Sequence, residues 1–360
     1  MVSISLCLIV RDESETIANC LQSVQGAVDE IILVDTGSVD NTKEIANTYA
    51  SRIFDFEWID DFAAARNFSF RQATKDYILW LDADDVLLPD DRDKLIALKN
   101  EADGSVDSYT MIYQIGFDEY GNPTLSLRRN RLVKRENQFR WHGPVHEYLA
   151  VGGKVVNSDI VVTHRRTHVE VGRNLAIYEK RAASGEAFSP RDLYYYANEL
   201  RDNAHYDKAI ETYIRFIDGK MGWVEDVLTA CHNLADIYRL QGDRERELAM
   251  IWRSFEYDLP RAEFCCRLGY WFLEQTRLKE AAFWYETAAS LTKPAETMGF
   301  MQEACWTWLP QLQLCVCYYR LGDFERANAR NEEAGKYRPR DERVLHNRSL
   351  LQGIRDNGTS

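Results

Sequence analysis

Length, composition and charge narrow the classes of protein to which this chain can belong. It has 360 residues, a length that favours more than one domain. Of these residues 45% are hydrophobic and 28% charged, which is the composition of a globular protein. The formal net charge of −13 disfavours broad binding to DNA or RNA, because the phosphate backbone repels an acidic surface. A local basic cluster is a candidate anion site, formed by Arg128, Arg129, Arg131, Lys134 and Arg135.

The first apolar run and the cysteines bear on the compartment. Residues 4–10 are too few to span a membrane, and acidic residues follow them where a signal peptide has its cleavage site. We therefore interpret this run as a buried strand and expect no membrane insertion.

The eight cysteines form no Cys-x-x-Cys pair, and most fall in apolar helical patterns. This pattern predicts buried free thiols and a reducing compartment, the cytoplasm.

The N-terminal part of the chain alternates between strand and helix patterns, which predicts an α/β fold with a parallel sheet covered on both faces. From residue 108 to 164 the pattern changes to shorter strands and turns, which predicts an antiparallel extension of the sheet. The expected strands are 3–10, 30–35, 52–56 and 77–82, and the expected helices between them are 13–24, 40–50 and 62–74.

After about residue 174 the chain is helical to its end, and small residues recur at a fixed spacing. In the clearest copy, Gly269 is followed by Ala281 twelve residues later and by Tyr285 sixteen residues later. Small residues allow helices to cross closely, and the aromatic side chain fills the space between paired helices. This pattern resembles tetratricopeptide repeats and predicts three or four helix pairs, followed by a capping helix over 344–354. The copies begin at Ala197, Ala235, Gly269 and Cys315.

Polar clusters follow three of the expected strands. In open α/β sheets the ligand lies outside the carboxyl ends of the strands, so three polar strand ends together are difficult to explain by structure alone. These clusters are Arg11-Asp12-Glu13, Asp35-Thr36-Gly37-Ser38 and Asp82-Ala83-Asp84-Asp85.

The acids of Asp82-Ala83-Asp84 are the sharpest of these features. Two carboxylates at the end of a buried strand repel each other, and a hard divalent cation such as Mn²⁺ or Mg²⁺ removes that repulsion. A nucleotide diphosphate supplies further oxygen ligands, and the metal then neutralises this leaving group as the bond to the sugar breaks. The alternative is a helix cap with solvated acids before Pro89.

In this context the N-terminal part closely resembles the inverting, GT-A-fold glycosyltransferases of family 2. The resemblance covers residues 3–90 strongly and 90–165 more loosely. It implies a GT-A catalytic domain with a Rossmann-like mixed sheet over residues 1–172, followed by an all-α, tetratricopeptide-like domain of about four helix pairs over 173–360. The segments that carry it, in matching order and spacing, are SLCLIVRDE, EIILVDTGSVDNT and DFAAARNFSFRQATKDYILWLDADD.

The resemblance also implies roles for individual residues in binding a UDP-sugar. Asp35 would hydrogen-bond the base, most often uracil, and Glu13 would lie near the ribose or base. Arg66 would contact the ribose or diphosphate. Asp84 would be the direct metal ligand, and Asp82 would contact the ribose or a metal-bound water. The remaining positions of this expected donor site are Val10, Arg11, Gly37, Ser38 and Ala83.

Simpler interpretations exist for two of these residues. Asp35 fits an ordinary turn before a helix, and Arg66 fits a surface ion pair with Asp60 or Asp61.

A second distinctive segment, WHGPVHE, spans residues 141–147. Subgroups of the family carry a similar Gly-x-Val-His-Glu segment opposite the metal, which implies that His146 completes the metal coordination. Glu147 would then orient a sugar hydroxyl or act near the acceptor. The alternative is a structural turn with a stacked tryptophan. His164 and His168 flank two arginines at reach of the diphosphate, although a surface location is the simpler interpretation for both.

An inverting transfer needs a base that removes the proton of the acceptor. The candidates are Glu147, Asp118 and Glu119. The acid–Asp pair that the family usually carries after the acceptor strand is not obvious here, so the choice among the three is open. A thiol acceptor would need less help, because a thiol is already partly ionised near neutral pH.

The two halves together resemble the bacteriocin S-glycosyltransferases, which modify a cysteine of a precursor peptide. The resemblance implies an enzyme, a hexosyltransferase with a peptide or protein acceptor (Cys, Ser or Thr) and with UDP-glucose or UDP-GlcNAc as donor. Repeat surfaces of this kind bind extended chains and also form homodimers. One alternative is a glycan or lipid-linked core sugar as acceptor. Another is a non-catalytic repeat scaffold, against which the intact Asp82 and Asp84 argue.

Overall fold

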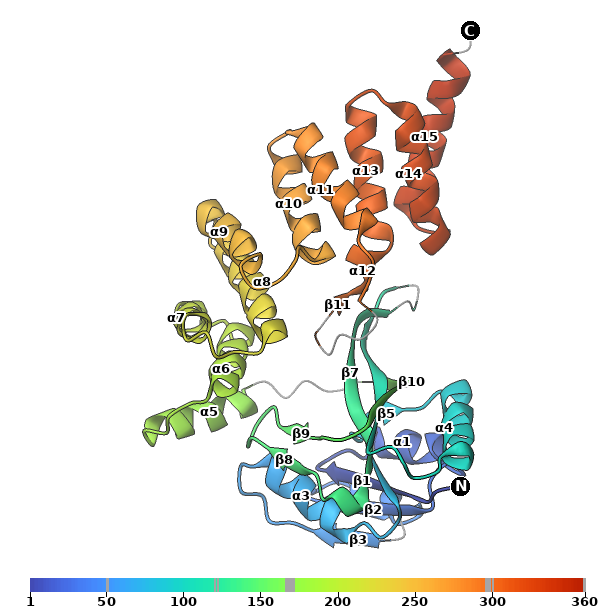
Figure 1. Ribbon diagram of the computed structural model, residues 1–360, viewed down its shortest axis with the longest axis vertical. Coiled ribbons are helices and arrows are strands. Elements are labelled where there is room, and N and C mark those ends of the chain that lie inside the picture. Colours follow the sequence, from blue (N-terminus) through green and yellow to red (C-terminus); the bar gives the residue numbers. More distant parts are fainter. Residues whose placement is uncertain are drawn as a thin grey trace. The chain divides into compact units, whose positions relative to one another are not determined.

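The computed structural model describes residues 1–49, 52–119, 121, 123–165, 172–294, 299 and 301–358. The chain folds into two compact units, one from Met1 to His205 and a second that begins at Tyr206 (Figure 1). A mixed sheet with helices forms the first, and helices dominate the second. The predicted order of fold classes, a GT-A-like α/β domain followed by a helical domain, is confirmed.

A single mixed sheet organises the first unit, with the strand order β3-β2-β1-β4-β7-β6-β10-β5. The first four of these positions are parallel, as predicted. Strand β7 is antiparallel to both β4 and β6, and β10 returns parallel to β6. The strands are β1 (Ile4–Val10), β2 (Glu30–Asp35), β3 (Arg52–Asp55), β4 (Tyr77–Trp80), β5 (Asp85–Val86), β6 (Ser108–Phe117), β7 (Pro123–Lys134) and β10 (Val155–His164), with a separate hairpin of β8 (Arg140–His142) and β9 (Tyr148–Ala150).

Both faces of this sheet are covered because side chains alternate along each strand. On one face, Leu6 and Leu8 of β1 pack in a buried cluster with residues of α1 and α4. On the other face, Cys7 packs in a second cluster with residues of α3 and of the β8–β9 hairpin. The helices of this unit are α1 (Ile17–Ser23), α2 (Thr42–Ala46), α3 (Phe62–Gln72), α4 (Pro89–Glu101), α5 (Arg173–Ala183) and α6 (Pro190–Asp202), with a short 3₁₀ helix at Arg135–Asn137.

The antiparallel extension is confirmed, but the expectation of shorter strands was wrong. Strands β6 and β7 have 10 and 12 residues, against 7 in β1. Their outer parts are only half-buried, so backbone pairing rather than an apolar pattern extends them. Hydrophobic periodicity therefore ends before the strands do.

The basic cluster does not form one surface patch, because its residues lie along β7 and the helical turn after it. Arg131 is fully buried. Arg128 donates to the backbone oxygen of Ser158 at 2.7 Å, and Arg135 donates to that of Lys75 at 2.6 Å. The arginines are engaged by the sheet itself.

Helices α5 and α6 belong to the first compact unit, although they follow the last strand. The change from strands to helices falls near the predicted boundary at residues 172 and 173, whereas the unit continues to His205. The sequence repeat that begins at Ala197 thus starts in one unit and ends in the other.

Paired helices make up the second unit: α8 packs on α9, α10 on α11 and α13 on α14, and α15 packs on α14 at the end. A Cβ atom added at Gly269 would lie 2.8 Å from the ring of Tyr285, which explains the small residue in the repeat. The helices are α7 (Tyr206–Asp218), α8 (Val224–Leu240), α9 (Arg244–Ser254), α10 (Ala262–Glu274), α11 (Leu278–Ser290), α12 (Glu303–Trp306), α13 (Trp308–Arg320), α14 (Phe324–Tyr337) and α15 (Glu342–Gly358), with a two-residue strand β11 (Met301–Gln302).

Two predictions about the whole chain can be compared with the described residues. All eight cysteines are buried and free, as predicted. Among the described helices, none combines the length and apolarity that a membrane span needs.

Candidate functional site at the carboxyl edge of the sheet

The three polar strand ends meet at one edge of the sheet. Strand β1 lies between β2 and β4 and is parallel to both, and Val10 at its end pairs with Asp35. Asp82 follows β4 by two residues. The alternation of strands and helices was enough to predict this meeting, because parallel neighbours end at the same edge.

Asp35 is held with one carboxylate oxygen engaged and the other open. Its Oδ1 accepts hydrogen bonds from the backbone N–H groups of Gly37 at 2.9 Å and Ser38 at 3.0 Å. Gly37 has φ of 107°, a value that favours glycine. The residue is 2% exposed, and no described residue donates to its Oδ2. A buried acceptor without a donor suits a ligand N–H group.

The loop after β1 is tied to the loop after β2. The backbone N–H of Asp12 donates to Ser38 Oγ at 3.0 Å, and Asp12 Oδ1 accepts from Val39 N at 2.7 Å. Glu13 accepts from the Thr16 hydroxyl at 2.6 Å. Val10 is buried and Arg11 is exposed beside Asp12. These contacts make the two loops one wall of the candidate nucleotide site.

Arg66 connects Asp82 to Glu147. Its Nη2 donates to Asp82 Oδ1 and its Nε donates to Glu147 Oε1, both at 2.6 Å. The guanidinium lies 5.0 Å from the ring centre of Trp80 and 4.9 Å from that of Trp141. The arginine is 8% exposed, and burial of this kind requires paired charges.

The alternative of a surface ion pair for Arg66 was therefore wrong. Asp61 instead caps α3, where it accepts from Ala64 N at 2.8 Å. Asp60 accepts from Lys180 Nζ at 2.7 Å. Burial on its own would raise the pKa of Asp82, but the neighbouring Arg66 and Arg131 hold that pKa well below its usual range. Asp82 is thus a carboxylate already occupied by a guanidinium.

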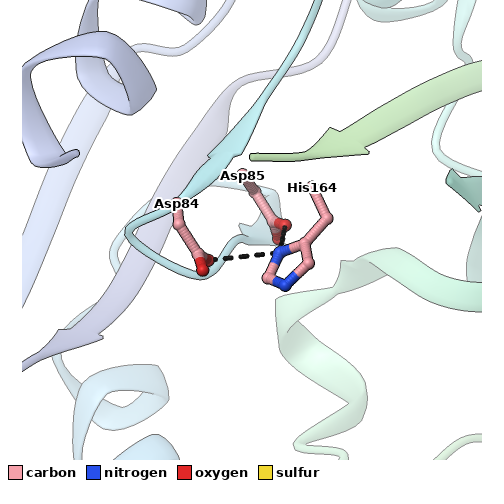
Figure 2. A group of neighbouring side chains, drawn as sticks. All are labelled: Asp84, Asp85 and His164. Atoms are coloured by element: carbon pink, nitrogen blue, oxygen red, sulfur yellow. Dashed lines mark hydrogen bonds and ion pairs between the residues drawn. The ribbon is translucent and has the colours of Figure 1, made fainter. Parts of the chain in front are cut away.

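Asp84, Asp85 and His164 form the acidic group of the site (Figure 2). The Nδ1 atom of His164 lies 3.3 Å from Asp84 Oδ1 and 3.3 Å from Asp85 Oδ1. Strand pairing explains this proximity, because β10 is antiparallel to β5 with His164 opposite Asp85. The Tyr113 hydroxyl is 2.9 Å from the same Nδ1. Burial alone would lower the pKa of His164, but the two carboxylates raise it to about 9.

Asp85 and Arg131 form an ion pair with no exposed surface. Arg131 Nη1 lies 3.0 Å from Asp85 Oδ2, and both side chains are 0% exposed. That oxygen also accepts from Asp82 N at 3.0 Å. The guanidinium lies 3.8 Å from the ring centre of Trp80 and 4.4 Å from that of Tyr113. Asp85 therefore fixes the turn that carries the three acids.

The donor set of the acidic group fits a divalent cation. Asp84, Asp85 and His164 each offer one ligand atom, and these atoms all lie within 4.8 Å of one another. Two carboxylates and an imidazole suit manganese, which accepts both ligand types. The side chains of Asp84 and His164 are 19% and 18% exposed, so a ligand can reach them from solvent.

The structure gives His146, the predicted metal partner, a different neighbour. Its Nε2 lies 2.6 Å from Glu199 Oε1, and its ring stacks on Tyr195 at 4.3 Å between ring centres. Within the described residues, the histidine beside the acidic pair is His164. The reason is topological: His146 lies in the loop between β8 and β9, outside the main sheet. His168 lies outside the described residues.

The predicted base candidates are also placed apart. Glu147 lies beside Arg66 and its side chain is 11% exposed. Asp118 and Glu119 follow β6 at the far end of the β6–β7 hairpin, beyond the pair of Phe117 with Pro123. Because Thr163 pairs with Gln114 and a strand rises ~3.3 Å per residue, Asp118 lies on the order of 10 Å along the hairpin from the level of His164. The ion pair with Arg66 ties Glu147 to the site.

Three residues of the site were missed or underrated from the sequence. The sequence placed Asp85 only in an acidic run and Arg131 in a candidate anion-binding cluster. For His164 it offered contact with the diphosphate, with a surface location as the simpler interpretation. A weak signal existed for His164, since it ends an apolar strand pattern as the other polar strand ends do. Ala83, a predicted donor-site residue, is buried at 4% exposure in the core beneath the turn.

Known proteins are similar to parts of this chain. The description "Glycosyl transferase family 2" matches residues 5–156. A TPR repeat-containing protein of Synechococcus elongatus is 36% identical over 147 residues, which is 41% of this chain and 35% of that protein. The prophage-derived glycosyltransferase SunS of Bacillus subtilis is 25% identical over 280 residues, which is 72% of this chain and 64% of SunS.

Solved structures show likeness in fold alone. S. aureus TarS 1–349 in complex with UDP-GlcNAc aligns with a TM-score of 0.39 and 15% identity, over 69% of this chain and 90% of TarS 1–349. The TPR protein YrrB aligns with a TM-score of 0.38 and 14% identity, over 50% of this chain and 84% of YrrB.

The chain spans between about a third and two thirds of the length of the curated relatives described above, 35% and 64% respectively. Residues 5–156, which contain the strand ends, the Asp82–Asp85 turn and Glu147, match the description of glycosyl transferase family 2.

Proposed function

We propose that this chain is an inverting glycosyltransferase that moves a hexose from a UDP-sugar to a peptide or protein side chain, with a divalent metal at the leaving group. The observation that carries the proposal is the meeting of two features at one sheet edge. One is the buried Asp35, whose Oδ2 has no donor among the described residues. The other is the group of Asp84, Asp85 and His164.

The donor fits this edge by its chemistry. Uracil carries a ring N–H that an aspartate accepts, and Asp35 Oδ2 is such an acceptor. We assign the wall formed by the loops after β1 and β2, including Glu13 and Ser38, to the ribose. The diphosphate and the carboxylates of the acidic group are both negatively charged, so a positive charge must lie between them.

Mn²⁺ or Mg²⁺ supplies that balance when bound, because it neutralises the charge that develops on the diphosphate leaving group. Asp84 and His164 would hold the cation, with Asp85 as the third candidate. Asp82 is paired with Arg66, and we therefore assign it to the ribose side rather than to the metal.

Glu147 is the base candidate that the structure supports best. It is the predicted carboxylate that contacts the donor-site residue Arg66, whereas Asp118 and Glu119 follow the end of β6. A base accepts the proton through a carboxylate oxygen, and the contact with Arg66 engages Oε1 of Glu147. A cysteine acceptor would make smaller demands on this base than a serine or threonine.

A peptide or protein acceptor is supported by the helical second unit, since stacked helix pairs present an extended surface suited to a chain. SunS, the Bacillus subtilis relative, is named a glycosyltransferase, and its match runs beyond the family 2 domain.

UDP-glucose is our default donor and UDP-GlcNAc the next. We place the protein in the cytoplasm, where its eight buried free cysteines stay reduced, and we leave homodimerisation through the helices as a second use of that surface.

The test of the donor and metal assignments is a thermal-shift screen of the full chain with UDP-glucose, UDP-GlcNAc, GDP-mannose and ADP-glucose, with and without MnCl₂. We expect stabilisation by a UDP-sugar that depends on Mn²⁺, together with release of UDP. Asp84→Asn should abolish both, and Asp90→Asn, which alters an exposed acid of α4, should change neither. Mn²⁺-independent behaviour of every nucleotide sugar would overturn the proposal.

The acceptor class is tested by mass spectrometry. A cysteine-, serine- or threonine-containing peptide should gain the mass of one hexose with UDP-glucose and Mn²⁺. Transfer to free sugars or to a lipid-linked sugar, with none to peptides, would replace the peptide assignment. A protein that binds UDP-sugars without any turnover would support the scaffold alternative.

A further inference from the structure

The loop between β8 and β9 has a backbone that needs support from outside itself. It runs from His142 to Tyr148. Gly143 has φ of 92° and His146 has φ of 50°. The second value is uncommon for a residue other than glycine and persists where surrounding contacts fix it. Glu147, the base candidate, is the next residue.

Helix α6 supplies the polar part of that support. Glu199 Oε1 lies 2.6 Å from His146 Nε2 and also accepts from Asn174 Nδ2 of α5 at 3.1 Å. The imidazole stacks on Tyr195 with 14° between the ring planes. Arg191 Nη2 donates to the backbone oxygen of His146 at 3.1 Å. The side chain and the backbone of His146 are thus both held by α6.

Apolar packing adds to these contacts. Val145 is 3% exposed and forms a buried cluster with Ile177 and Tyr178 of α5. On its other side the loop is tied to α3, because Phe62 N donates to the backbone oxygen of Pro144 at 2.8 Å. Helix α3 also carries Arg66, which binds Glu147. The loop is therefore held by α5 and α6 on one side and by α3 on the other.

We infer that α5 and α6 complete the catalytic unit, and that Glu199 is a positioning residue that acts through His146 on Glu147. This inference rests on the proposed function, because it assigns a role in the reaction to the loop. The family 2 match ends at residue 156, before either helix. The compact unit runs to His205, which agrees with helices that serve the catalytic site rather than the repeats.

The variants that test the inference are Glu199→Ala, Glu199→Gln and Asp202→Asn in the full chain. Asp202 is an exposed carboxylate on the same helix that pairs with Arg201, so its variant is the matched control. Glutamine keeps an oxygen acceptor for the His146 ring N–H, whereas alanine removes it. Steady-state hydrolysis of UDP-glucose with Mn²⁺ gives kcat and KM, and peptide-level hydrogen–deuterium exchange over residues 141–150 reports on the loop.

We expect Glu199→Ala to lower kcat by up to ~100-fold, the scale of a misplaced catalytic group, with an unchanged KM for UDP-glucose and faster exchange in the loop. Glu199→Gln should keep most of the wild-type kcat and most of the wild-type protection of the loop from exchange. Asp202→Asn should equal wild type in both quantities. Equal kcat and equal loop exchange in Glu199→Ala and wild type would overturn the inference while Asp84→Asn still abolishes turnover. If the wild type itself shows no turnover, the proposed function fails, and with it the catalytic role of Glu199, whatever the exchange shows.

Discussion

Asp82 and Glu147 are held by two different nitrogen atoms of one guanidinium group, that of Arg66. Each carboxylate accepts from it at 2.6 Å. Asp82 follows β4 by two residues and leads to the acidic group, whereas Glu147 lies in the loop supported by α5 and α6. One buried arginine therefore links the proposed donor side of the site to the proposed acceptor side.

The first prediction concerns this arginine. Arg66→Met leaves two partly buried carboxylates without their cation, which should lower the free energy of unfolding of the first unit by about 3–5 kcal/mol. The free energy of unfolding of Arg66→Lys should lie between those of wild type and Arg66→Met, because an ammonium keeps the charge but cannot donate in the fixed fork of a guanidinium. Arg71→Met, on the exposed side of α3, is the control and should cost less than ~0.5 kcal/mol. Urea unfolding measures all three.

The pH dependence of this effect has a definite sign. Arg66 lowers the pKa of Asp82, so the stability from the pair is present above the unfolded carboxyl pKa of ~3.9 and is lost as pH falls through the lower, folded-state pKa. The difference between wild type and Arg66→Met should be full at neutral pH and shrink in acid. A difference that grows on acidification would contradict the assignment.

The second prediction separates the two histidines. His164→Ala should weaken the binding of Mn²⁺, measured by calorimetry or electron paramagnetic resonance in the presence of UDP, by about 10- to 100-fold. His146→Ala should leave Mn²⁺ affinity unchanged, because its ring is bound to Glu199. The reverse result would restore His146 as the metal partner that the family resemblance implied.

The third prediction concerns the buried pair of Arg131 and Asp85. Arg131→Met strands a carboxylate that is 0% exposed and should cost about 3–5 kcal/mol of unfolding free energy. Adding Asp85→Asn should recover part of that loss, since an amide tolerates burial better than an unpaired charge. The double-mutant cycle gives the coupling. Strictly additive losses would show that the two side chains do not stabilise each other.

The fourth prediction tests nucleobase recognition by Asp35. In Asp35→Asn one amide position still accepts from Gly37 and Ser38, so the amide nitrogen faces the position of Oδ2 and presents donors where an acceptor was. Binding of UDP should weaken by roughly 10- to 100-fold, as expected for the loss of a hydrogen bond to a charged group. Asp55→Asn, at the exposed end of the neighbouring strand β3, is the control. Unchanged UDP affinity in Asp35→Asn would contradict this role.

The fifth prediction concerns the helical unit. Gly269→Ala places a methyl group 2.8 Å from the ring of Tyr285 and should destabilise the second unit by about 1–3 kcal/mol through overpacking. Gly353→Ala in α15 has nothing within 4 Å of the added carbon, and should be neutral or stabilising by up to ~1 kcal/mol. Thermal unfolding compares the two, and equal effects would argue against the close contact.

The sequence by itself determined the order of elements and the three polar strand ends, because strand and helix periodicity are local and parallel neighbours end at one sheet edge. It also determined the paired helices, from the spacing of Gly269 and Tyr285. It did not determine the partners within the site. His164 lies beside Asp85 only because β10 pairs with β5, and Arg131 is buried only because β7 lies next to β4.

The same holds for the loop that carries His146 and Glu147. Its composition indicated a functional segment, but its contacts with Glu199 and Arg66 join it to two helices, α6 and α3, that no local pattern relates. Tertiary structure decided which histidine lies beside the acidic pair, which carboxylate is already paired and which oxygen of Asp35 stays open. Those choices depend on long-range pairing and burial, and a periodicity read along the chain contains neither.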